Sequence, residues 1–322
     1  MIELLQQPAS QDLPPVECYW NPGEQTGCEQ LKLLLLHHAA GVSGLAGRCC
    51  GRLAKNSVGI LTYHRISEAY AGIPCPTINV TPQTFRRQLT GLKQAGFCFM
   101  SLSAVLQACQ NPRTSADLPE RTVVVTFDDI YDNVFHNAWP VLQELEIPAT
   151  FFISTAFIDG REPFRFDPWA MNYCDQIPMA AWQPVTDAHL KSMLDSDLAD
   201  VGAHTHTHQD FRNRPDDFFA DVRRGMTELE LRYGLDQLPF AFPYGNPRMG
   251  FSDERLMNAV RDLGLQCGLT TGAHCNVTDS SPFGWGRFHV FEHDTAHSLT
   301  SKLDGWYEWL PKIKTLLTGS VS

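Results

Sequence analysis

Along most of the chain, short apolar runs alternate with amphipathic stretches. The runs at residues 58–64 (VGILTYH) and 121–127 (RTVVVTF) are rich in β-branched residues and are typical of buried strands. The stretch at 81–96 predicts a helix, because Thr81 suits the N-cap and Pro82 the first helical position. Strands that alternate with helices indicate an α/β protein, with a mainly parallel sheet that is either open or closed into a barrel.

The same pattern predicts most of the remaining elements. Further strands are expected at residues 97–100, 149–154, 199–203, 238–242, 267–270 and 286–291, and further helices at 103–109, 133–146, 186–195, 215–233, 252–264 and 296–317. Pro140 is expected to kink the helix that contains it.

The chain divides into two parts. Residues 1–55 form an N-terminal appendage with one apolar helix, and residues 56–322 form the main domain. Residues 159–185 are rich in aromatic residues and proline and show no clear period, so they are expected to be an insertion over one end of the sheet, where binding loops usually lie.

Composition narrows the class of protein. The 322 residues are 43% hydrophobic, enough for one large core, and an α/β barrel of this length is common. The net charge of −11 and the lack of any Lys/Arg block argue against nucleic acid as a partner.

Two features bear on where the protein works. Ten scattered cysteines without a C-x-x-C pair favour a reducing compartment, and the first residues lack a secretory signal, so a cytoplasmic location is expected. The apolar run at 31–47 is short for a bilayer span and contains two histidines. It is expected to be a packed or interfacial helix, which would allow a weak association with a membrane surface.

Two segments that follow predicted strands carry the side chains of a metal site. Asp128 and Asp129 end the run RTVVVTF, while His204 and His208 follow the run ADVGA. Adjacent carboxylates supply one metal ligand and a base beside it, and histidines at i and i+4 can share one face of a helical turn. One carboxylate with two imidazoles leaves coordination positions open for water, as a hydrolytic zinc site requires.

Each of these residues also has a simpler explanation. Carboxylates are favoured at a helix N-terminus, although one would suffice as a cap, and histidines can be incidental in a polar loop. Three histidines in five residues favour the metal, with His206 in a supporting or exposed position. The third segment, Pro243-Tyr244-Gly245, is a turn after a strand whose backbone amides could face a ligand.

The three segments TFDD, H-T-x-T-H and F-x-F-P-Y-G, in this order, resemble those of the polysaccharide deacetylases of carbohydrate esterase family 4. These enzymes share a homology domain named after a rhizobial nodulation deacetylase. The opening run LTYHRI also resembles the first strand of that family, and the similarity covers roughly residues 56–295. The resemblance implies a deformed (β/α) barrel of about seven strands.

The resemblance also implies residue roles and a reaction. One divalent metal ion, usually Zn²⁺, would be bound by Asp129, His204 and His208. Asp128 would be the general base for the attacking water, and the backbone N–H of Tyr244 would hold the oxyanion. The implied substrate is an N- or O-acetylated sugar or saccharide, and acetate is one product.

The sequence departs from the family pattern in three places. Many members pair the base with an arginine at the position of Ala241, so here that charge is missing or comes from elsewhere. The family's Asp-x-x-Asp-Trp segment has no counterpart. The general acid is expected at His293, although the alternative at His289 resembles a variant ending that lacks the acid.

Alternatives therefore remain at this stage. His64 could line the site or be purely structural, and the Trp and Phe residues of 164–185 could stack on sugars or simply pack the insertion. A hydrolase of another amide or ureide could use the same scaffold. A catalytically silent carbohydrate-binding homologue is supported by the missing arginine and the ambiguous general acid, and opposed by the retained Asp128.

Overall fold

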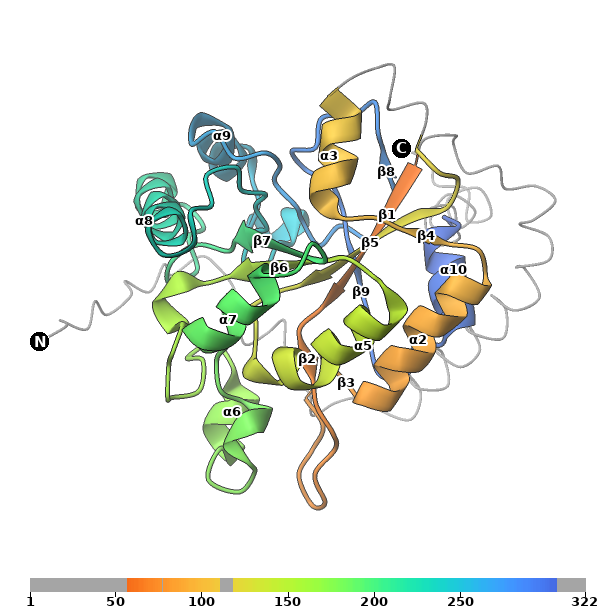
Figure 1. The fold of residues 1–322 in the computed structure, drawn as a ribbon. Helices are drawn as coiled ribbons and strands as arrows, with labels where there is room; N and C mark the ends of the chain where they lie inside the picture. The colour runs from red at the N-terminus through yellow and green to blue at the C-terminus, as the bar shows by residue number, and fades with distance from the viewer. Residues whose placement is uncertain (1–56, 77, 111–117, 306–322) are drawn as a thin grey trace, which may run out of the picture.

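The computed structural model describes residues 57–76, 78–110 and 118–305 (Figure 1). Its central strands are β1 (Ser57–Tyr63), β5 (Thr122–Phe127), β6 (Ala149–Ile153) and β7 (Ala199–Ala203). They pair in parallel in the order β7-β6-β5-β1, which confirms the expected parallel sheet. The predicted appendage at 1–55 and the end of the helix predicted at 296–317 lie outside the described residues.

Beyond β7 the sheet curves back toward β1. Parallel pairing continues through the single bridges Ala203–Phe240, Ala241–Leu269 and Gly268–Phe283. A few residues later, β9 (Phe288–His289) pairs in parallel with β1, so the pairing returns to its first strand. This arrangement confirms the deformed (β/α) barrel, although the strands predicted at 238–242 and 267–270 are reduced to single bridges.

Short strands complete the sheet. β4 (Cys98–Phe99) pairs with the start of β5, and β8 (Asn276–Val277) pairs antiparallel with the start of β1. A separate ladder joins β2 (Arg65–Ile66) to β3 (Asn79–Val80). Both β4 and β8 thus pair at the amino ends of the central strands, away from the carboxyl ends.

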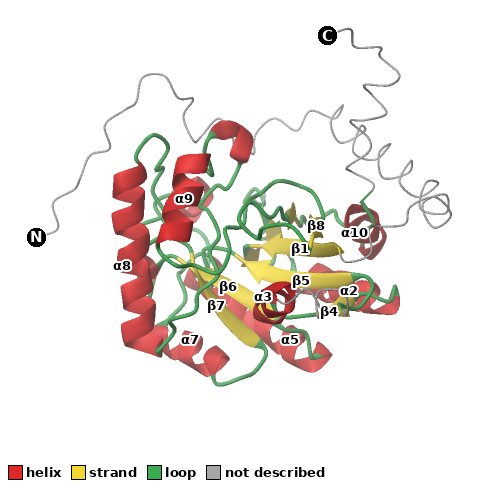
Figure 2. Cartoon of the chain, turned by 90° about the horizontal axis from the view of Figure 1, so that it is seen from above, coloured by secondary structure: helices red, strands yellow, loops and turns green. Residues whose placement is uncertain are grey.

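Helices surround the strands in both views (Figures 1 and 2). They are α2 (Pro82–Gln94), α3 (Leu102–Gln110), α5 (Trp139–Leu145), α6 (Pro168–Tyr173), α7 (Asp187–Leu194), α8 (Pro215–Tyr233), α9 (Glu254–Asp262) and α10 (Ala296–Leu303). The shorter turns are η2 (Val134–Ala138, π-helical) and the 3₁₀ turns η3 (Thr155–Phe157), η4 (Met179–Ala181) and η5 (Pro247–Met249). Thr81 caps α2 as predicted, accepting a hydrogen bond from the Thr84 backbone N–H at 3.3 Å. The distortion expected at Pro140 is present as η2, which leads into α5.

No helix among the described residues is both long and apolar enough to cross a membrane. The six cysteines that the structure describes are all free thiols. The cytoplasmic location inferred from the cysteine pattern stays a prediction.

The predicted insertion is fastened to β2 by a buried arginine. Arg65 is 1% exposed and forms an ion pair with Asp167, while its Nε donates a hydrogen bond to the Ala181 carbonyl at 2.9 Å. The guanidinium lies over the rings of Tyr131 and Trp169, with its carbon 4.2 and 4.6 Å from the ring centres. Trp169 belongs to an apolar cluster within the insertion, so this tryptophan packs the insertion.

We expect Arg65→Ala to lower the free energy of unfolding by about 3–5 kcal/mol, because the Asp167 carboxylate would remain buried without its partner. Arg86→Ala is the matched control, since the ion pair of Arg86 with Glu144 is exposed to water and contributes little. Urea denaturation of both variants measures the difference. Equal losses for the two would show that the Arg65–Asp167 pair does not hold the insertion.

Candidate active site

The side chains predicted to carry the chemistry meet at the carboxyl ends of the parallel strands. Asp128 and Asp129 follow β5, His204 follows β7, and His64 follows β1. Tyr244 follows the bridge segment at residues 240–241. This is the end of a (β/α) barrel at which active sites form, because loops from several strands converge there.

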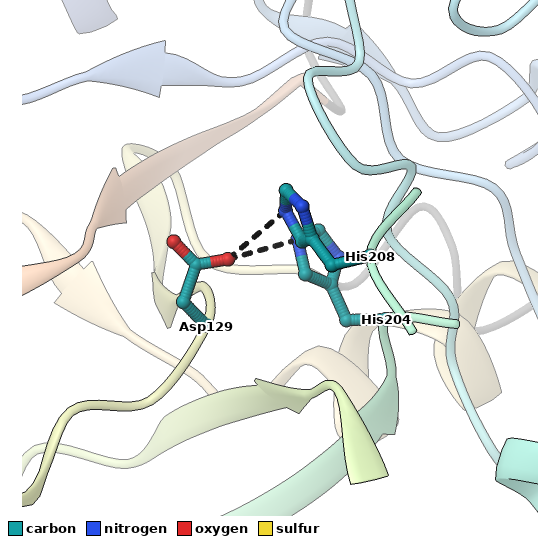
Figure 3. Close-up of side chains that lie close together, drawn as sticks. All are labelled: Asp129, His204 and His208. Carbon is teal, nitrogen blue, oxygen red and sulfur yellow. Dashed lines mark ion pairs between the residues drawn. The ribbon is translucent and has the colours of Figure 1, made fainter. Parts of the chain in front are cut away.

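Asp129, His204 and His208 form a buried cluster with their donor atoms facing one another (Figure 3). The Oδ1 atom of Asp129 lies 3.5 Å from Nε2 of His204 and 3.1 Å from Nε2 of His208. Donor atoms around a tetrahedral zinc ion, with bonds of about 2.0–2.1 Å, lie roughly 3.3 Å apart. The predicted ligands therefore meet at the spacing that such an ion needs.

Two further observations fit a metal at this cluster. Within the described residues, Oδ1 of Asp129 has no hydrogen-bond partner although it is buried. Nδ1 of His204 lies 2.8 Å from the Ala241 carbonyl oxygen and donates a hydrogen bond to it. That bond fixes the tautomer and leaves the lone pair of Nε2 directed at the cluster, as in metal sites of proteins. The donor set therefore fits a divalent metal.

Left-handed backbone conformations accompany the site. Asp129, His208 and Tyr244 have φ values of 64°, 52° and 60°. This region costs a non-glycine residue about 1–2 kcal/mol and is concentrated at functional sites. Here it turns the chain sharply after the strands, so that adjacent residues such as Asp128 and Asp129 meet different partners.

Asp128 is held by an arginine that the sequence analysis did not assign to it. Nη1 and Nη2 of Arg287 donate hydrogen bonds of 2.7 and 2.8 Å to the two oxygens of Asp128. Both side chains are buried. Nη1 also contacts the hydroxyls of Thr62 and Thr126 at 3.2 and 3.3 Å. The charge missing at Ala241 is thus supplied from the segment just before β9.

This contact determines the charge of Asp128. Burial raises the pKa of Asp128, but the Arg287 guanidinium, together with the nearby His204, outweighs it and lowers the pKa to about 2. The carboxylate is therefore ionised at neutral pH and able to accept a proton. In the same way His208 and His204 overcome the effect of burial on Asp129 and hold its pKa well below the usual value.

The structure separates His64 and His289, which lie together, from His293. His64 and His289 stack with ring centres 5.6 Å apart and an interplanar angle of 24°. Burial lowers the pKa of His64, and the charges of Asp129 and Asp128 oppose that shift. Burial and the neighbouring His64 lower the pKa of His289 to about 3. His293 is exposed and borders a cavity of about 370 Å³ beside α2.

Aromatic rings close around His208. Phe166, from the insertion, stacks on the His208 ring with centres 3.6 Å apart, and Tyr244 meets it edge-on at 4.9 Å. The segment around Phe166 therefore lies against this end of the sheet. In the described part of the chain, the backbone N–H of Tyr244 donates no hydrogen bond, which leaves it available to a ligand.

His206 stands apart from the cluster. Its Nδ1 lies 2.8 Å from the Thr155 hydroxyl, and its backbone N–H donates to Asp221 at 2.6 Å. The side chain is buried, so His206 supports the loop and is not exposed.

A parallel α/β barrel with an Asp-His-His cluster that fits a metal, and an ionised carboxylate beside it at the carboxyl ends of the strands, is typical of a metal-dependent hydrolase. Residues 115–268 match the family model described as polysaccharide deacetylase. This match confirms the resemblance to the polysaccharide deacetylases found in the sequence.

Relatives and solved structures agree with this assignment. A poly-β-1,6-N-acetyl-D-glucosamine N-deacetylase of Staphylococcus epidermidis is 23% identical over 273 residues, covering 79% of this chain and 86% of its own length. The structure of IcaB from Ammonifex degensii has a TM-score of 0.61 at 24% identity, covering 77% of this chain and 97% of that one. The deacetylase PplD of Streptococcus pyogenes, in complex with acetate, has a TM-score of 0.60 at 19% identity, covering 77% and 98%.

Proposed function

We propose that this protein is an N-deacetylase that releases acetate from an N-acetylated polysaccharide, with polymers of β-1,6-linked N-acetylglucosamine as the leading candidates. The observation that carries the proposal is the placement of Asp128, held ionised by Arg287, next to the cluster of Asp129, His204 and His208. The β-1,6 linkage is proposed because relatives that are 23% identical to this chain are poly-β-1,6-N-acetyl-D-glucosamine N-deacetylases.

The geometry supports the following roles. A divalent metal, proposed to be zinc, would be held by Asp129, His204 and His208, and would lower the pKa of water and polarise the acetyl carbonyl. The Asp128 carboxylate accepts a proton from water as the oxygen of that water bonds to the carbonyl carbon. The Tyr244 N–H donates to the carbonyl oxygen as negative charge develops on it. When the C–N bond breaks, the nitrogen takes up a proton, and acetate and a free amine leave.

We further propose His64 as the residue that passes a proton to the leaving nitrogen. It follows β1 at the carboxyl end of the sheet, beside Asp128 and Asp129. Burial lowers the pKa of His64, and the charges of Asp129 and Asp128 oppose that shift. His289, with its pKa at about 3, is neutral and unsuited to this role. His293 remains the candidate from sequence alone, but its exposed position beside α2 supports it less.

The structure removes the main argument for a catalytically silent homologue. That alternative was supported by the missing arginine at Ala241. Arg287, just before β9, instead makes a bidentate contact with Asp128. A protein that only binds carbohydrate has no use for a carboxylate kept ionised in a buried position, which is costly without a partner.

Acetate release from a panel of substrates tests the proposal. We expect zinc-loaded protein to release acetate from β-1,6-linked N-acetylglucosamine oligomers, more slowly from β-1,4-linked ones, and least from O-acetylated xylan. Chelation should abolish release, and added zinc should restore it. Metal binding without turnover on any member of the panel would favour the silent homologue, and hydrolysis of a ureide alone would favour the other hydrolase.

A further inference from the structure

A second group of metal-binding side chains lies three residues after Asp129. Asp132, two residues before η2, is joined by His136 from η2 and His189 from α7. Nδ1 of His189 lies 2.6 Å from Oδ1 of Asp132, and Nε2 of His136 lies 3.2 Å from Oδ2. The two imidazoles thus approach opposite oxygens of one carboxylate, and one donor atom from each of the three residues lies within 4.8 Å of the others.

The charge at this point favours a cation. The Asp132 side chain is fully buried, and no Lys or Arg forms an ion pair with it in the parts of the chain that the structure describes. Its other contact is the side-chain amide of Gln183, 2.6 Å from Oδ2, and an amide can turn its oxygen toward a cation. A buried carboxylate is costly unless a positive charge compensates it.

The histidines give such a cation access and fix its position. His136 is 49% exposed and His189 29% exposed, so an ion can enter from solvent and keep water as a further ligand. Phe135 stacks on the His189 ring, with centres 4.1 Å apart and planes at 6°, which holds the imidazole in place. Two imidazoles with one carboxylate form a donor set suited to zinc more than to magnesium or calcium.

We propose that Asp132, His136 and His189 bind a second divalent cation of the zinc type, separate from the one at Asp129. The site joins the end of the insertion to the segment that follows the catalytic aspartates. Backbone hydrogen bonds already link these segments, from Asp132 N–H to Gln183 at 2.9 Å and from Val185 N–H to Ile130 at 3.1 Å. Figure 1 shows α7 beside α5, into which η2 leads. The cation would cross-link these two segments and so hold the insertion over the active site.

Metal counting on the full-length protein tests the proposal without any assay of activity. We expect the chelated and reloaded protein to retain two zinc ions per chain after gel filtration. His189→Gln and His136→Gln should each retain one, and His204→Gln should also retain one. The double variant His204→Gln/His189→Gln should retain none. His297→Gln removes an exposed histidine elsewhere and should still retain two.

Two further measurements locate the ion and its effect. Anomalous diffraction at the zinc edge should give a peak between Asp132, His136 and His189. Zinc should also raise the midpoint of thermal unfolding in His204→Gln, because a ligand that binds only the folded state stabilises it, and His189→Gln should remove that rise. The proposal would be overturned by two zinc ions in His189→Gln, or by one zinc per chain in the wild type that His204→Gln removes and His189→Gln retains. One zinc per chain that His189→Gln removes and His204→Gln retains would count only against the proposed deacetylase site.

Discussion

Replacing Asp128 with asparagine should lower kcat for acetate release by about 10²–10⁴-fold, the range typical of losing a general base. Asparagine has nearly the same shape and can still accept a hydrogen bond from Arg287, but its amide cannot take a proton from water. The change therefore removes the proton acceptor, together with one of the two hydrogen bonds from Arg287. Initial rates on the best substrate of the panel measure the effect.

Metal content separates this effect from simple loss of the site. Asp128→Asn should keep its zinc, whereas Asp129→Asn should lose it, because Asp129 faces both His204 and His208. Asp200→Asn, on β7 and bound to Ser103, makes the same chemical change away from the active site and should retain wild-type activity. Near-normal turnover by Asp128→Asn would show that the base is a different residue.

The meeting of Asp129, His204 and His208 could be predicted from sequence because local patterns determine it. Each of their segments follows an apolar run, and the carboxyl ends of parallel strands meet at one end of a barrel. Residues as distant as Asp129 and His204 could therefore be expected to meet. The spacing of His204 and His208 added the second imidazole, and the structure brings both to Asp129.

Arg287 could not be predicted in the same way. It lies 159 positions from Asp128. Nothing in the pattern of the strand predicted at 286–291 distinguishes a guanidinium that points inward from one that faces solvent. One indirect indication was present in the sequence. Because Ala241 stands where many family members have an arginine, a buried base needs a cation from another part of the chain. A search for an arginine next to a late strand would have found it.

The irregular strands of the barrel and the contacts of the insertion also could not be predicted from hydrophobic periodicity. The apolar runs at 238–242 and 267–270 suit strands, yet tertiary packing leaves them with single bridges, because strand pairing depends on neighbours that the local sequence does not specify. The contact of Phe166 with His208 could not be predicted either, because the insertion has no periodic pattern that shows which of its residues face the site.

Replacing Arg287 with glutamine should cost about 3–5 kcal/mol in the free energy of unfolding, because it leaves the Asp128 carboxylate buried without its partner. Arg287→Lys keeps a positive charge but cannot make the bidentate contact, so an intermediate loss of unfolding free energy is expected. Thermal and urea unfolding of both variants measure the stability.

A pH profile then shows whether Arg287 acts through Asp128 or only supports the fold. With Arg287 present the pKa of Asp128 is about 2, so the base is ionised across the working range. Without it, burial would raise the pKa, the carboxyl would hold its proton at mildly acidic pH, and activity would return as pH rises. The acid limb of kcat/KM should therefore move to higher pH in Arg287→Gln, and less so in Arg287→Lys. A uniform loss of activity at every pH would instead indicate that Arg287 supports only the folded structure.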